Sequence, residues 1–214
     1  MGAVRPLGAG RGQSQTPNDG SPCGVPGCAT CASLRAAAVS LSSRRGIQAV
    51  TSEGIAAEAR IGGEEAARHY PTLDHCLSAA YDESTTHFRD VASRAMEGDG
   101  SWQERLHAAV EATVEAFDAR PDLARYCVVE AWRCNLPMLR ASRIAGRRRY
   151  IQMLTEHRRS GGDEALPEVR MEMFVGAGHH VSGEELEQGD GYSLQERLDG
   201  LIEVFEPAMA SPAR

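Results

Sequence analysis

Three cysteines near the N-terminus have the residue type and spacing of a metal-binding segment. Cys23, Cys28 and Cys31 are separated by four and by two residues, and the Gly and Pro between them favour a tight chelating loop. Thiolates bind zinc and iron–sulfur clusters, which take four ligands, so a fourth must come from elsewhere. Its candidates, near the start of the expected fourth helix, are His69, His75 and Cys76. The alternative is a set of ordinary thiols, so no cofactor is required, and zinc or an iron–sulfur cluster remains open.

The other reactive side chains do not form a catalytic set. The sequence contains no GxSxG elbow, no HExxH pair and no phosphate-binding loop signature, so we do not expect an enzyme. His179 and His180 are adjacent and point apart on a helix, which favours surface or interface positions over a metal site. Cys127 and Cys134 are expected to be small buried hydrophobic residues.

Helical patterns fill the chain after its first 30 residues. Residues 1–30 are rich in Gly, Pro, Ser, Gln and Asn, which predicts a disordered arm. Beyond them apolar residues recur every three or four positions, and no strand pattern appears. The sequence therefore predicts an all-α fold. Helices are expected at about 31–45, 51–59, 64–70, 72–96, 102–119, 121–132, 137–159, 165–187 and 193–209.

Charge is unevenly distributed along the chain. The net charge is −7, yet residues 1–71 hold seven Arg against five acidic residues, and the remainder holds 16 Arg against 25. All 23 basic residues are Arg, whose guanidinium suits bidentate phosphate contacts. A basic head on an acidic body is typical of a DNA-binding unit joined to a ligand-binding unit. No apolar run is long enough to span a bilayer and no secretory signal is visible, so we expect a cytoplasmic protein without a membrane partner.

Residues 34–83 follow the helix-turn-helix plan, three short helices with a tight break between the second and third. The positions that carry it are Ala37, Ala38, Leu41, Arg45, Gly46, Thr51, Ile55, Ala56, Ala59, Ile61, His69, Tyr70, Pro71 and Asp74. At these positions the segment resembles the DNA-binding domain of TetR-family regulators. The resemblance implies a helix-turn-helix domain at 31–71 and a helical ligand-binding and dimerisation domain at 72–214.

The resemblance also implies which residues contact DNA. They are Arg44, Arg45, Thr51, Ser52, Gly62, Gly63, Glu64, Arg68, His69 and Tyr70. The segment departs from the family pattern at the turn, where Arg60 replaces the usual Gly, and in the recognition helix. There Glu64 and Glu65 open the helix, and Ala67 replaces a Tyr that donates to a phosphate. Acidic groups oppose phosphate binding, although Glu also accepts from cytosine in the major groove.

For the C-terminal part the resemblance implies a ligand pocket and a dimer interface. The expected pocket residues are Trp102, His107, Phe117, Tyr126, Trp132 and Met138. An apolar pocket with one or two polar groups suits a small apolar effector. We expect a homodimer, paired through its last two helices, that represses transcription at a palindromic site in double-stranded DNA and is released by the effector. The alternatives are a TetR-like ligand- or protein-binding module that has lost DNA binding, and a metal or redox sensor built on the three cysteines.

Overall fold

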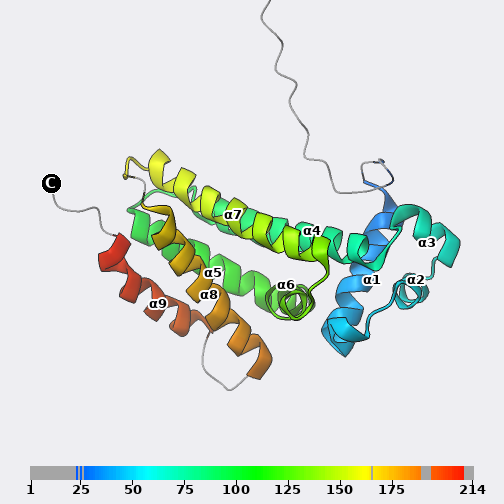
Figure 1. Ribbon diagram of the computed structural model, residues 1–214. Helices are drawn as coiled ribbons and strands as arrows, with labels where there is room; N and C mark the ends of the chain where they lie inside the picture. The colour runs from blue at the N-terminus through cyan, green and yellow to red at the C-terminus, as the bar shows by residue number, and fades with distance from the viewer. Residues whose placement is uncertain (1–22, 24, 26, 165, 189–193, 210–214) are drawn as a thin grey trace, which may run out of the picture.

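The computed structural model describes residues 23, 25, 27–164, 166–188 and 194–209. Within these ranges every regular element is a helix, which confirms the predicted all-α fold. The predicted disordered arm falls largely outside the described residues. Figure 1 shows the first three helices gathered at one end of the molecule, with the longer helices extending away from them.

The N-terminal head consists of three short helices. α1 (Ala29–Arg45) is followed by a 3-10 turn, η1 (Ile47–Ala49), by α2 (Ser52–Ala59) and by α3 (Gly63–His69). α2 begins where the sequence predicted, because the Thr51 hydroxyl accepts a hydrogen bond from the Gly54 N–H at 3.0 Å. The small head core contains Leu34, Ala38, Leu41, Ile47 and Ile55.

The turn between α2 and α3 depends on Arg60. This residue has φ 58° and ψ 40°, and its N–H donates to the Ala57 carbonyl at 3.1 Å, which closes α2. Arg60 is the one non-glycine residue with positive φ among those the structure describes. A side chain in the left-handed conformation costs roughly 1–2 kcal/mol. Arg60 therefore adopts, at this cost, the conformation that suits the Gly usual at this turn in the family that the segment resembles.

Replacing Arg60 with glycine is expected to raise the free energy of unfolding by about 1 kcal/mol, because Gly adopts the left-handed conformation without a Cβ clash. Chemical denaturation of the full chain measures the change. Arg60→Ala is the control, since it removes the guanidinium but keeps the strained Cβ, and its stability should stay within about 0.5 kcal/mol of the original. A less stable glycine variant would mean that the strain is not what limits this turn.

Six further helices and one 3-10 turn form the body. They are α4 (Leu73–Ala95), α5 (Trp102–Ala119), α6 (Pro121–Val128), η2 (Glu130–Arg133), α7 (Pro137–Ser160), α8 (Glu168–Gln188) and α9 (Leu194–Met209). Their starts follow local signals that the sequence displays. Ser101 and Glu104 form a capping box on α5, and proline occupies the first turn of α6 and α7. Among the described helices, none combines the length and the apolar character needed to cross a membrane.

The body packs in layers around α4. α4 lies against α5 and α7, while α8 packs on α9, and α9 in turn contacts α5. One buried cluster joins the head to the near end of the body and includes Leu34, Leu77, Tyr81 and Tyr126. A second cluster fills the far end and includes Met96, Trp102, Leu106, Leu154, Met171 and Ile202.

Hydrogen bonds add to the apolar packing near the junction of the head and the body. The Asp74 carboxylate, in the first turn of α4, accepts from the Met138 and Leu139 N–H groups at 2.8 and 2.9 Å and so caps α7. The Glu130 carboxylate in η2 accepts from the Ile47 N–H in η1 at 3.0 Å. η2 is therefore bonded directly to the head, whereas Asp74 joins the first turns of α4 and α7 within the body.

Candidate functional site

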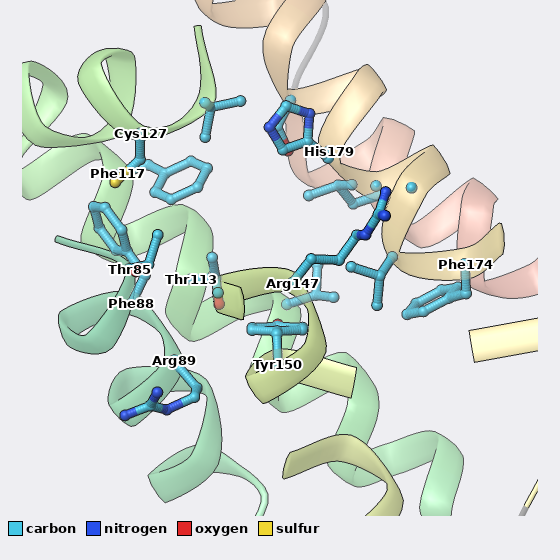
Figure 2. A pocket seen from close by; sticks show the side chains of 18 of the residues that line it. Thr85, Phe88, Arg89, Thr113, Phe117, Cys127, Arg147, Tyr150, Phe174 and His179 are labelled. Atoms are coloured by element: carbon cyan, nitrogen blue, oxygen red, sulfur yellow. The ribbon is translucent and has the colours of Figure 1, made fainter. Parts of the chain in front are cut away.

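A cavity of about 340 Å³ that is partly open to solvent lies in the body, lined by residues of α4 to α9 (Figure 2). Most of its wall is apolar. The apolar lining includes Phe88, Val110, Phe117, Phe174, Leu198 and Leu201. Phe88 and Phe117 meet edge to face, with their ring centroids 4.8 Å apart. Cavities of roughly 300–1,000 Å³ with apolar walls and few polar groups hold drug-sized ligands, so this one suits a small or slender molecule.

His179 supplies the cavity with an unused polar atom. It lies on α8 (Figure 2), and its ring packs on Trp132 of η2 with centroids 4.3 Å apart. Its Nε2 atom is buried and has no hydrogen-bond partner among the described residues. Burial lowers the pKa of His179 to about 4, and the charges of Arg147, His180 and Arg143 add to this effect. The imidazole is therefore neutral at pH 7 and can donate or accept one hydrogen bond with a ligand.

Stability is expected to fall as the pH drops from about 6.5 to about 4, because His179 takes up a proton in the unfolded chain but not in the fold. The loss of stability due to this residue reaches about 3 kcal/mol once the pH is below its pKa in both the unfolded and the folded chain. Denaturant unfolding at several pH values measures the slope. His179→Gln should remove most of it, whereas His180→Gln, at the exposed neighbour, removes only a minor contribution to the lowered pKa and should leave most of it in place. An unchanged slope in His179→Gln would contradict the assignment.

Arginines provide the cavity with positive charge. Arg147 of α7 and Arg89 of α4 both line it, and Figure 2 shows Arg147 reaching towards α8. Arg89 pairs with Asp90 at 3.1 Å, whereas no described carboxylate lies within 4 Å of Arg147. Burial raises the pKa of Tyr150, which faces the same space, to about 12, so its hydroxyl stays protonated and can donate. The cavity thus combines an apolar interior with one unpaired guanidinium.

Two of the six predicted ligand residues, Phe117 and Trp132, line this cavity, and the other four lie outside it. Trp102 is buried in the far core, beneath the guanidinium of Arg158. Tyr126 is fully buried and its hydroxyl donates to the Leu77 carbonyl at 2.6 Å. His107 contacts Asp199 at 3.1 Å on α9, and Met138 is exposed at the start of α7.

The sequence reasoning missed several lining residues, namely Thr85, Thr113, Arg147, Tyr150 and His179. Arg147 belongs to a run of three arginines, a pattern typical of a solvated helix face, and His179 was expected at the surface or at an interface. A usable signal was present in the helix glycines. Gly146, Gly176 and Gly178 all line the cavity, although each costs a helix about 1 kcal/mol relative to alanine.

Most of the predicted DNA contacts lie on the exposed side of the head. The exposed ones are Arg44, Arg45, Thr51, Ser52, Gly62, Gly63, Glu64 and Arg68. Arg44 is engaged within the head, since its guanidinium pairs with Glu58 of α2. The exposed face of α3 therefore presents Arg68 together with Glu64 and Glu65.

His69 and Tyr70 are less exposed than the other predicted contacts. Tyr70 is only 5% exposed, and its hydroxyl accepts a hydrogen bond from Arg35 at 2.9 Å. His69 is half-buried, and its Nδ1 atom lies 3.3 Å from the Cys31 sulfur. The two residues lie at the C-terminal end of α3, on the side that faces α1, so they present less of their side chains to a phosphate than the exposed residues do.

The three N-terminal cysteines come together around His69. Cys23, Cys28, Cys31 and His69 each offer one ligand atom, and these atoms all lie within 4.8 Å of one another. Of the candidate fourth ligands, the structure places His69 in this group. Cys76 is buried nearby, with its thiol directed at the Leu34 carbonyl at 3.7 Å, and His75 lies beside Thr72.

Comparison with known proteins identifies the fold. No protein-family model matches the chain, and no curated protein matches it in sequence. Among solved structures, the fatty acid degradation regulator FadR of Bacillus halodurans is 18% identical, with a TM-score of 0.72 over 85% of this chain and 97% of its own. FadR of Bacillus subtilis, solved with stearoyl-CoA, is 16% identical, with a TM-score of 0.70 over 84% and 99%. FadR of Thermus thermophilus, a TetR-family repressor solved with lauroyl-CoA, is 18% identical, with a TM-score of 0.62 over 86% and 98%. The chain therefore has the fold of the TetR-family transcription regulators.

Proposed function

We propose that this protein is a ligand-responsive transcription regulator, which binds DNA through its head and releases it when a ligand fills the body cavity. The observation that carries the proposal is the position of η2. This four-residue turn places Trp132 in the cavity wall and Glu130 on the Ile47 N–H of the head. A ligand that displaces Trp132 would act on the same short turn whose Glu130 is bonded to the head. The regulators with the same fold support the proposal.

A charged network extends this connection to α8. Glu130 is 1% exposed, and its second oxygen lies 3.4 Å from Arg125 and 3.3 Å from Arg133. Arg125 also donates to the Leu186 carbonyl at 2.8 Å, and Arg133 pairs with Glu187 at 3.0 Å, both on α8. Because α8 also carries His179, two walls of the cavity converge on the same buried carboxylate. The DNA-binding form and the ligand-bound form would differ in the positions of η2 and α8 relative to the head.

The cavity favours an amphipathic ligand with a long apolar part and an anionic end. Its aromatic and aliphatic wall would bury the apolar part, and Arg147 would pair with the anion while His179 or Tyr150 donates a hydrogen bond. The FadR structures solved with stearoyl-CoA and lauroyl-CoA support this class, because an acyl chain joined to a negatively charged carrier has the same two parts.

Exposed apolar residues on α8 and α9 support the expected homodimer. Val169 and Met173, one turn apart on α8, are each 59% exposed, and Val204 on α9 is 74% exposed. Pairing these faces between two copies would bury them and would set two heads for neighbouring turns of the major groove. Met173→Glu combined with Val204→Glu should convert the dimer to monomer in sedimentation experiments. A double variant that stays dimeric would place the interface elsewhere.

The test begins with selection of fragments of the source genome by the purified protein at low and at moderate salt. We expect one palindromic site to survive moderate salt, with a dissociation constant on the order of 10⁻⁸ M. Laurate and lauroyl-CoA are then titrated into the complex, and the effective probe should weaken binding at least about tenfold. Arg147→Ala should blunt this response, whereas Arg148→Ala, at the adjacent exposed position outside the cavity, should not. Recovery of random fragments that are lost as salt rises would overturn the proposal.

The acidic residues in the first turn of α3 favour a second candidate function, that of a ligand- or protein-binding module that binds no operator. Glu64 and Glu65 are both exposed on α3, where they would repel phosphates. If this candidate holds, the wild-type chain binds no discrete site, and Glu64→Ser combined with Glu65→Lys creates salt-sensitive DNA affinity where none existed. Wild-type binding in the nanomolar range would rule the candidate out.

A further inference from the structure

We propose that Cys23, Cys28, Cys31 and His69 bind a single zinc ion and that this ion fastens the C-terminal end of α3 to the N-terminal end of α1. Metal binding by these four residues does not depend on the proposed function. Its consequence for DNA binding does, because only then is α3 the helix that enters the major groove.

The distances between the ligand atoms match one tetrahedral ion. The Cys23 and Cys31 sulfurs lie 3.5 Å apart, and the His69 Nδ1 atom lies 3.3 Å from the Cys31 sulfur and 3.6 Å from the Cys28 sulfur. Ligands placed about 2.0–2.3 Å from a tetrahedral zinc ion are separated by about 3.5–3.8 Å. A disulfide would bring two sulfurs to about 2 Å, and none of the six cysteines forms one.

Local structure aims three of the ligands at one point before any metal binds. Cys28 is the N-cap of α1, and its sulfur accepts from the Cys31 N–H at 3.5 Å, so the two side chains share one end of the helix. Gly27 has a φ of 68°, and the Cys28 N–H bonds the Val25 carbonyl at 3.3 Å, which turns the chain so that Cys23 lies beside Cys31. The positive end of the α1 dipole favours thiolates over thiols at this location.

The ligand set and its compactness select zinc. Three cysteines and one histidine form a common structural zinc site, with softness and geometry that suit this ion. An iron–sulfur cluster distributes its ligands over more than one iron, whereas all four atoms here lie within 4.8 Å of one another. No position is left for a substrate or water on the tetrahedron, so the site is structural rather than catalytic.

The zinc ion would stabilise α3 more than any other helix. This helix has seven residues, and none of them is buried, so it gains little from packing. Helices of this length are unstable by themselves in water. The metal bond at His69, its last residue, would join α3 to the segment that holds the three cysteines, 38 or more residues away in the chain.

The experiment measures the metal content of the full chain purified without added chelator, together with its thiol reactivity and the visible spectrum of its cobalt(II) form. We expect about one zinc ion per chain, cobalt bands of a tetrahedral thiolate site, and slow alkylation of three thiols until a chelator is added. Cys31→Ser and His69→Asn should each lower retained zinc to less than about a tenth, whereas Cys134→Ser and His180→Asn should retain it. If a ligand variant fails to fold, the cobalt spectrum and the thiol protection of the wild-type chain still decide the matter. Protein that retains no zinc after incubation with the ion, or that instead carries iron with sulfide, would overturn the proposal.

Discussion

Glu130→Ala is expected to lower the free energy of unfolding by about 3 kcal/mol and to disconnect ligand binding from DNA release. The substitution leaves the buried Ile47 N–H without an acceptor and strips Arg125 and Arg133 of their shared carboxylate. Removing one member of a buried ion pair costs about 3–5 kcal/mol. We expect the lower end of that range, because both arginines are partly exposed and can turn to water. Denaturant unfolding measures the stability, and fluorescence titration of the ligand probe measures the coupling.

Glu130→Gln is the matched control for this prediction. The amide oxygen can still accept from the Ile47 N–H, but the amide nitrogen is a donor and cannot replace the oxygen that contacts Arg125 and Arg133, so the cost should be about 1–2 kcal/mol. In Glu130→Ala the probe should still bind the body with little change in affinity, while its effect on operator affinity falls to less than about twofold. A variant of wild-type stability that responds fully to the probe would show that η2 does not transmit the signal.

Removing the zinc ion is expected to weaken operator binding by at least about tenfold, a prediction that rests on both proposals. Without the metal, α3 is joined to α1 only by weak contacts, and the order that DNA binding requires must then come from the binding energy itself. Fluorescence anisotropy with the selected fragment compares the purified protein, the chelated protein and the protein resupplied with zinc. Resupply should restore the original affinity.

Cys134→Ser separates this effect from general thiol damage, since Cys134 lies outside the metal-binding group and should respond to chelation as the original chain does. The thermal unfolding midpoint of the chelated protein should also fall, because the metal stabilises only the folded form. Operator affinity that is unchanged by complete zinc removal would leave the ion a structural role away from the recognition surface.

Helix positions were predictable because their signals are local. Thr51, Ser101 and Pro137 each mark a helix start through chemistry confined to a few neighbouring residues, and the structure uses all three. The left-handed turn at Arg60 was predicted from the glycine that the family places there. The three cysteines were evident from their spacing, but three candidates for the fourth ligand remained, because only the packing of α3 on α1 brings His69 to them.

The cavity could not be assigned in the same way, because helix faces in the body are weakly marked. α7 carries seven arginines and no continuous apolar stripe, so nothing local shows that Arg147 and Tyr150 line the cavity while Arg148 and Arg149 do not. Trp102 and Tyr126 were attractive as ligand contacts because they are large and aromatic. Such side chains also fill cores, and the distinction depends on long-range packing that a single sequence does not display.

α4 can act as a rigid rod that connects the junction with the head to the wall of the cavity. At one end Asp74 holds the first turn of α7 beside the head, and several turns further on Thr85, Phe88 and Arg89 form cavity wall. A helix of 23 residues is about 35 Å long, so a tilt of roughly 5° about one end would sweep the other through about 3 Å. In a twofold dimer the two rods tilt in opposite senses, and the separation of the heads changes by up to twice that distance. Against a groove repeat of about 34 Å, a mismatch of this size is enough to take one head out of register.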